Sequence, residues 1–332
     1  MSAEKIISDW KKKMFKPLYW LEGEEEFYID KVINYAEHEI LPESEAGFNL
    51  TVFYGKDADW SAVVNACMRY PMFAEKQVVI LKEAQQMRDI EKLENYIENP
   101  LASTIFVVSY KEKTLDKRKT LYKTIKKNGE IFTSEKIKEY KLVEWVGEYV
   151  QSQGYTASQK AVILLAEHIG NDLSRISNEI DKVVINLGTK KNITEDDIEK
   201  FVGVSKEYNV FELQDALGKK NLAKAIRIIQ YFESNPKAAP IQLILPALYG
   251  YFSKLYAIFG MTDKSEAAVK TLFYNNPFVA KQAIETAKIY SYNGVEQALL
   301  LLHEYNLRSI GVNDKGTSDA SLLKEMVVKI MS

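Results

Sequence analysis

Short apolar runs alternate with segments of helical periodicity in the first part of the chain. Runs rich in β-branched and aromatic residues predict strands at 18–21, 50–54, 77–81, 104–109 and 130–133. Between them, apolar residues three and four positions apart predict helices at 24–39, 60–69 and 90–98, and a lysine-rich helix that ends at Gly129. Strands that alternate with helices form a parallel sheet covered on both faces. We therefore expect an α/β domain over residues 1–136.

Beyond residue 136 the pattern is helical only, and no further strand is predicted. The motif Thr-Ala-Ser-Gln at 156–159 and the motif Thr-Glu-Asp-Asp at 194–197 predict helix starts. Gly170 and Gly188 predict helix ends. About five more helices follow, with breaks expected at 235–236, 262, 276–277, 293–294 and 313–317. A softer boundary near Ser205 divides this part into a small helical domain, 137–205, and a larger one, 206–332.

Composition narrows the class of protein. The chain has 332 residues, of which 46% are hydrophobic and 27% charged, with a net charge of −2 and one cysteine. A single cysteine excludes an internal disulfide and a zinc site built on paired cysteines. The N-terminus lacks the apolar core of a signal peptide, so we expect a reduced, cytoplasmic protein. The apolar segment 241–261 contains Pro246, Gly250 and Lys254, which favours a packed core helix over a membrane span.

The turn after the first predicted strand lacks the features of a phosphate-binding loop. It reads Gly-Glu-Glu-Glu at 23–26, and these carboxylates would repel a triphosphate. The sequence Gly-Lys followed by Ser or Thr does not occur in the chain. Lys82 ends the third strand, where an active ATPase has a magnesium-binding Asp. We expect no catalytic residue, no cofactor and no metal site. The alternative is an active nucleotide-dependent enzyme with a diverged site, which tight magnesium-dependent ATP binding would favour.

Several short motifs follow one another in an informative order. They are LYWLEGEEEF at 18–27, the segment 60–81 with PMFA at 71–74, LDKRK at 115–119, NEIDK at 178–182, ITEDD at 193–197, NVFEL with Asp215 and Ala216 at 209–216, and NPFV at 276–279. Together they resemble the family of delta subunits of the bacterial DNA polymerase III clamp loader, an ATPase-inactive relative of AAA+ proteins. The chain departs from the family pattern at Met72, where Leu is common, and over 308–320.

The resemblance implies a fold and a function. The α/β domain, 1–136, would have an AAA+ or RecA-like parallel sheet with a degenerate nucleotide site and would bind the clamp. Residues 137–205 would form a small helical lid, and residues 206–332 a helical-bundle collar that joins the ATPase and delta-prime subunits. The resemblance also implies that the chain and these partner subunits are parts of the DNA polymerase III holoenzyme. Within it, this subunit would bind and open the sliding clamp (the beta subunit) during DNA replication, without hydrolysing ATP itself.

Met72 and Phe73 are the candidate clamp-binding residues, together with Pro71. Pro71 disfavours helical geometry at Tyr70 and so directs a turn after the predicted helix. A large apolar pair on a loop suits a pocket on a partner. In the alternative, Phe73 packs beneath its own sheet, which the residues alone favour. The resemblance favours the clamp.

A basic segment at 111–127 holds eight Lys or Arg residues and two acidic ones. Lys117, Arg118, Lys119 and Lys123 are candidates for contact with primed DNA or with a neighbouring subunit. The alternative is a solvated helix face. A third class of function, a helical DNA-binding regulator, is disfavoured by the isoelectric point of about 6.1 and by the lack of a basic recognition helix. Retention of duplex DNA by the isolated chain would favour it.

Overall fold

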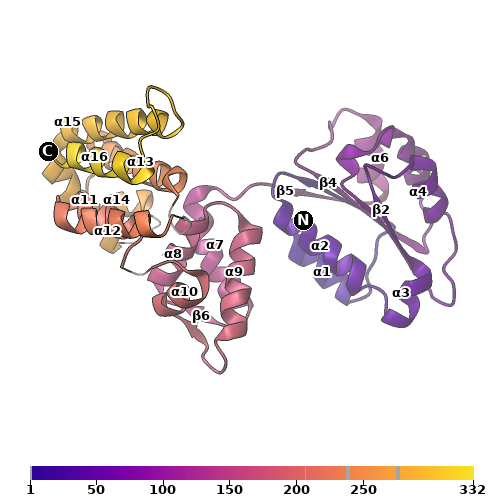
Figure 1. Cartoon of the computed structure of the whole chain (residues 1–332). Helices are drawn as coiled ribbons and strands as arrows, with labels where there is room; N and C mark the ends of the chain where they lie inside the picture. Colours follow the sequence, from indigo (N-terminus) through magenta and orange to yellow (C-terminus); the bar gives the residue numbers. More distant parts are fainter. Residues whose placement is uncertain (1, 206, 237–239, 274–276) are drawn as a thin grey trace. The chain divides into compact units, whose positions relative to one another are not determined.

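The chain forms two compact units, Met1–Ile137 and Lys138–Ser332. The computed structural model describes residues 2–205, 207–236, 240–273 and 277–332, and Figure 1 shows its elements. The division of the second unit near Ser205 stays a prediction, and Lys206, the expected start of the last domain, lies outside the described residues.

A five-stranded parallel sheet forms the centre of the first unit, as the sequence predicted. Its strand order is β2-β3-β4-β1-β5. The strands are β1 (Leu18–Gly23), β2 (Leu50–Tyr54), β3 (Gln77–Lys82), β4 (Thr104–Lys111) and β5 (Glu130–Ser134). Leu50 of β2 pairs with Val78 of β3, and Leu18 of β1 pairs with Phe106 of β4. The central strands are buried on both faces, which explains their continuous apolar runs.

Alternate residues of each strand point to opposite faces of the sheet, and each face has its own core. Leu18 and Trp20 pack with α4 (Trp60–Cys67), α5 (Glu94–Ile97) and α6 (Thr120–Asn128). Tyr19 and Leu21 pack with α1 (Ala3–Lys11) and α2 (Glu26–His38). Figure 1 shows these two helical layers on either side of the strands. Cys67 is buried in the first core, as expected, and burial raises the pKa of its thiol.

Two helices of this unit were not predicted. They are α1 and α3 (Glu43–Asn49). α1 begins after Ser2, whose side chain accepts a hydrogen bond from the Lys5 backbone N–H, and it buries Ile6 and Trp10. α3 is only seven residues long and has no apolar stripe. The predicted lysine-rich helix is α6, which starts at Thr120 and ends just before Gly129. The predicted helix at 90–98 begins as a 3-10 helix, η2 (Ile90–Leu93), before α5.

The second unit is mainly helical, but the prediction that it contains no strand was wrong. Two-residue strands β6 (Thr156–Ala157) and β7 (Asn192–Ile193) pair in parallel. Consequently Ser158, rather than Thr156, caps α8, accepting from the Ala161 N–H. The capping box of Thr194 and Asp197 is confirmed. The helices are α7 (Leu142–Ser152), α8 (Gln159–Ile169), α9 (Leu173–Asn186), α10 (Glu195–Val202), α11 (Val210–Gly218), α12 (Leu222–Ser234), α13 (Ile241–Gly260), α14 (Glu266–Val269), α15 (Pro277–Ser309) and α16 (Asp319–Met331).

The helices from α11 to α16 share one core. α15 is two helical segments joined at Ser291, whose backbone is non-helical, close to the break expected at 293–294. The expected break at 276–277 begins at Asn276, outside the described residues. α13 is long and apolar enough to cross a membrane by length and composition alone. Its residues Leu248, Phe252 and Leu255 are fully buried in the core, as the sequence predicted for a core helix. Cytoplasmic localisation stays a prediction.

Candidate functional site

The loop between α4 and β3, residues 68–76, carries its largest side chains in solvent. Phe73 is 96% exposed, Tyr70 is 77% exposed and Met72 is 52% exposed. Phe73 also has a φ angle of 57°, in the left-handed region that bulky residues rarely adopt. The structure therefore places Phe73 in solvent rather than beneath its own sheet. We call Met72 and Phe73 the tip of this loop.

The base of the loop is fixed by the amide of Gln77, a buried residue at the start of β3. Its Nε2 donates to the carbonyl oxygen of Arg69 at 2.6 Å and to Thr104 Oγ1 at 2.8 Å. Thr104 Oγ1 in turn donates to the carbonyl oxygen of Cys67 at 2.8 Å. Carbonyl groups at the C-terminus of a helix lack partners within the helix. Here the side chains of β3 and β4 supply partners, so the chain leaves α4 in a defined direction.

The tip is fixed by Asn49, the last residue of α3. The pairing of β2 with β3 places the residue before Leu50 beside the chain that enters β3. The buried Asn49 side chain accepts from the Met72 N–H at 2.7 Å and donates to the Met72 carbonyl oxygen at 2.9 Å. Sequence reasoning missed Asn49, since no periodicity relates it to a residue 23 positions later.

Further apolar side chains lie exposed in the same two segments. Phe48, the neighbour of Asn49 in α3, is 71% exposed, and Met68 at the start of the loop is 57% exposed. Isolated apolar residues on a surface need no explanation, but a group of them marks a binding surface. The exposed apolar residues of α3 and the loop are Phe48, Met68, Tyr70, Met72 and Phe73.

The backbone N–H groups of the turn after β1 are hydrogen-bonded within the protein. The Gly23 N–H donates to the Lys113 carbonyl oxygen at 3.0 Å, and the Glu24 N–H donates to the Ser134 carbonyl oxygen at 3.0 Å. Gly23 has a φ angle of 126°, and a Cβ there would lie 2.0 Å from the Ser134 carbonyl oxygen. In a phosphate-binding loop such N–H groups point at the anion. Here the ends of β4 and β5 accept them instead.

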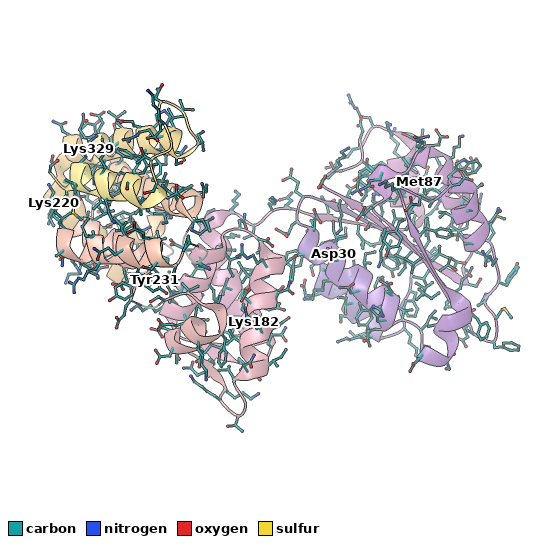
Figure 2. The ribbon with its side chains drawn as sticks, in the orientation of Figure 1. Asp30, Met87, Lys182, Lys220, Tyr231 and Lys329 are labelled. Atoms are coloured by element: carbon teal, nitrogen blue, oxygen red, sulfur yellow. The ribbon has the colours of Figure 1, made fainter. Side chains whose placement is uncertain are left out.

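Two lysines at the ends of β3 and β4 are paired inside the unit. Lys111, at the end of β4, contacts Glu26 at 3.1 Å and Asp30 at 2.8 Å, both on α2; Figure 2 labels Asp30. Burial alone would lower the pKa of Lys111, but the hydrogen bonds to these carboxylates outweigh it and raise that pKa. Lys82, at the end of β3, pairs with Glu37 at 2.6 Å.

Glu22 is a buried carboxyl group of this region, as is Glu25. Glu22 accepts from the Leu115 N–H at 2.9 Å, and its burial raises its pKa against the effect of that hydrogen bond. Among the residues that the structure describes, no group of three or more His, Cys, Asp or Glu side chains is arranged to hold a metal ion. The expected absence of a cofactor stays a prediction.

The four candidate basic residues are exposed but do not share one helix. Lys117, Arg118 and Lys119 precede α6, and only Lys123 lies within it. Arg118 pairs with Asp116 at 2.8 Å, and Lys119 pairs with Glu91 at 3.0 Å.

Known proteins resemble this chain in family, sequence and structure. Residues 19–135 match the model of the family "DNA polymerase III, delta subunit". The chain is 23% identical to the DNA polymerase III subunit delta of Bacillus subtilis (strain 168), over 95% of this chain and 93% of that protein. It is also 23% identical to the probable DNA polymerase III subunit delta of Aquifex aeolicus (strain VF5), over 90% of this chain and 89% of that protein.

A solved structure supports the fold over the whole length. The Bacillus subtilis DNA clamp loader delta protein superposes with a TM-score of 0.58 at 22% sequence identity, covering 99% of each chain. The fold class predicted from the sequence, a parallel α/β unit followed by helices, is thereby confirmed. The chain is thus similar to DNA polymerase III delta subunits, through the family model over residues 19–135 and through relatives along most of its length.

Proposed function

We propose that this chain binds the sliding clamp by inserting the tip, Met72 and Phe73, into an apolar pocket of the clamp. Binding there would help to open the ring during DNA replication. The observation that carries the proposal is the exposure of Phe73, at 96%, on a loop whose base and tip are both held by buried amides. An apolar side chain held in solvent gains nothing for its own fold, so its free energy of burial is available to a partner.

The size of this contribution suits a grip that can be released. Burying both side chains would contribute about 3–5 kcal/mol of gross transfer free energy. Because the backbone of the tip is already ordered in the free protein, little conformational entropy is lost on docking. The remaining affinity would come from neighbouring exposed residues such as Tyr70 and Phe48.

We further propose that ATP is bound and hydrolysed by partner subunits rather than by this chain. Two features support this proposal. The backbone N–H groups of Gly23 and Glu24 are already bonded to carbonyl oxygens, and Lys111 is paired with Glu26 and Asp30. A triphosphate bound at the turn after β1 would have to break these contacts and would meet the carboxylates at 24–26.

Residues 206–332 are the proposed collar, which would assemble with the ATPase and delta-prime subunits, and residues 137–205 are the proposed lid. Primed DNA would be contacted within that assembly through Lys117, Arg118, Lys119 and Lys123. The ion pairs of Arg118 and Lys119 do not prevent this, because solvent screens exposed pairs and leaves them weak. Charge reversal at Lys117, Arg118 and Lys119 should reduce clamp loading more at low salt than at high salt. Unchanged loading at every salt concentration would exclude these contacts.

The tip is tested with the double variant Met72→Ala and Phe73→Ala. Clamp affinity should fall by a factor of about ten or more, measured by surface plasmon resonance with purified clamp. The melting temperature should stay nearly constant, since both side chains are largely exposed. The control pair is Ile185→Ala and Ile310→Ala, which are 80% and 64% exposed in the second unit. Wild-type affinity in the tip variant would refute the proposal.

A further inference from the structure

The backbone at the tip is in a conformation that its own side chain does not stabilise. Phe73 has a φ angle of 57°, which brings the Cβ of an L-residue close to its own backbone. Its ring is 96% exposed, so packing within the protein does not compensate for this geometry. Residues in strained backbone regions persist only where the surrounding structure holds them. Some other part of the chain must therefore hold the tip.

Asn49 is placed to do so. Its side chain is 3% exposed, and its two functional atoms bond to both backbone groups of Met72, the residue before Phe73. Nδ2 also donates to the Glu45 carbonyl oxygen at 3.1 Å, one turn earlier in α3. Within the described residues, no other hydrogen bond to the backbone of residues 70–73 accompanies this pair.

The pair requires the chemistry of an amide. The Met72 N–H needs an acceptor and the Met72 carbonyl needs a donor, and Asn offers both from one planar group. Asp has the same shape but offers only acceptors when ionised, so it would repel the Met72 carbonyl oxygen. Ala offers neither atom.

We propose that Asn49 is a positioning residue that presets the tip in its docking conformation before the clamp arrives. This inference rests on the proposed function, because it concerns how the tip reaches the clamp. Without Asn49 the tip populates its docking conformation only part of the time. The apparent dissociation constant then rises by the inverse of that population. Loss of two hydrogen bonds predicts a rise of roughly tenfold.

The first measurement needs no clamp. Amide hydrogen exchange at Met72 should be slow in the wild type, because its N–H donates to Asn49, and fast in Asn49→Ala. Asn49→Asp keeps an acceptor and should give intermediate protection. This readout separates positioning from docking, and it remains valid if the tip has another partner. Equal exchange at Met72 in wild type and Asn49→Ala would overturn the inference.

The second measurement is clamp affinity with a matched control. Asn128 ends α6 in the same unit, and its Nδ2 donates to the carbonyl oxygens of Ile97 at 2.9 Å and Glu98 at 3.0 Å. Asn128→Ala removes a similar pair of hydrogen bonds away from the tip. Clamp affinity should fall roughly tenfold in Asn49→Ala, less in Asn49→Asp, and remain at the wild-type value in Asn128→Ala.

A double-mutant cycle distinguishes positioning from a general loss of structure. In the Met72→Ala, Phe73→Ala background, Asn49→Ala should weaken clamp binding no further, since nothing remains to be positioned. An equal loss in both backgrounds, or an equal loss in Asn128→Ala, would overturn the inference. Failure of the proposed function would appear differently, as normal affinity in the tip variant, while exchange at Met72 would still report on Asn49.

Discussion

The two edges of the five-stranded sheet carry loops with opposite properties. All strands are parallel, so their C-terminal ends lie on one side of the sheet, here called the carboxyl edge, and their N-terminal ends on the other, the amino edge. The turn after β1 lies at the carboxyl edge. The 68–76 loop, which precedes β3, lies at the amino edge. At the carboxyl edge, backbone donors are bonded and charges are paired within the unit. At the amino edge, the largest apolar side chains of the loop are held in solvent.

The proposed recognition site lies at the end of the sheet opposite to the one where this type of fold binds ligands. Ligands of open α/β sheets bind at the carboxyl ends of the strands, and here the protein itself occupies the turn where phosphates would bind. The sheet is kept as a rigid support, while the proposed recognition site is built at its other edge. Under the proposed function, this architecture would serve recognition of a partner rather than phosphate binding, because function depends on local sites rather than on the fold.

The strongest test of the carboxyl edge is Gly23→Ala. The added Cβ would lie 2.0 Å from the Ser134 carbonyl oxygen, at a φ angle of 126°. We expect a loss of roughly 3 kcal/mol in the free energy of unfolding, measured by urea denaturation. Gly47→Ala is the control, since a Cβ there meets no atom within 4 Å. A variant as stable as the control would show that the turn after β1 is not closed as described.

A smaller effect is expected from Glu22→Gln, which depends on pH. Burial raises the pKa of Glu22 above its ordinary value of 4.5, so the folded protein retains a proton that the unfolded chain releases. This group therefore favours folding below the unfolded pKa, and its contribution is lost as the pH rises through the folded pKa. Gln still accepts from Leu115 but cannot ionise. Its stability relative to wild type should be higher at about pH 8 than at about pH 4.

Thermal unfolding over this pH range is the measurement. If the difference in stability between Glu22→Gln and wild type were the same at both pH values, the carboxyl edge would not hold Glu22 in a desolvated site.

The smallest effect is expected from nucleotide. If the backbone donors of Gly23 and Glu24 stay bonded to carbonyl oxygens, magnesium and ATP at about 1 mM should leave the melting temperature unchanged within about 1 °C. A ligand at 100 times its dissociation constant would stabilise the fold by about 2.7 kcal/mol, a shift of several degrees. Such a shift would show that nucleotide binds the protein and would contradict the closed turn after β1.

The sequence predicted the strands well because burial on both faces leaves continuous apolar runs, as in β3 and β4. The residues alone favoured packing of Phe73 beneath its own sheet, and only the family resemblance pointed to Met72 and Phe73 as an exposed pair; their role in clamp binding stays a prediction. The sequence did not predict α3, because the seven residues of this helix carry no amphipathic pattern. Asn49 was missed for the same reason.

The closure of the carboxyl edge was predicted only in part. The carboxylates at 24–26 indicated that a triphosphate would be repelled. The hydrogen bonds from Gly23 and Glu24 to backbone carbonyl oxygens could not be predicted, because they do not depend on the pattern of side chains. Lys111 and Asp30 are 81 residues apart, and the pairing of β1 with β4 and the packing of α2 against β4 bring them together.

Contact between the tip and the clamp can be measured most directly by photo-crosslinking. A benzophenone side chain placed at Phe73 should crosslink to purified clamp, because this position is 96% exposed at the end of a fixed loop. The same group at Ile185, which is 80% exposed in the second unit, should give no clamp adduct. Formation of the complex without a crosslink from position 73 would contradict the account.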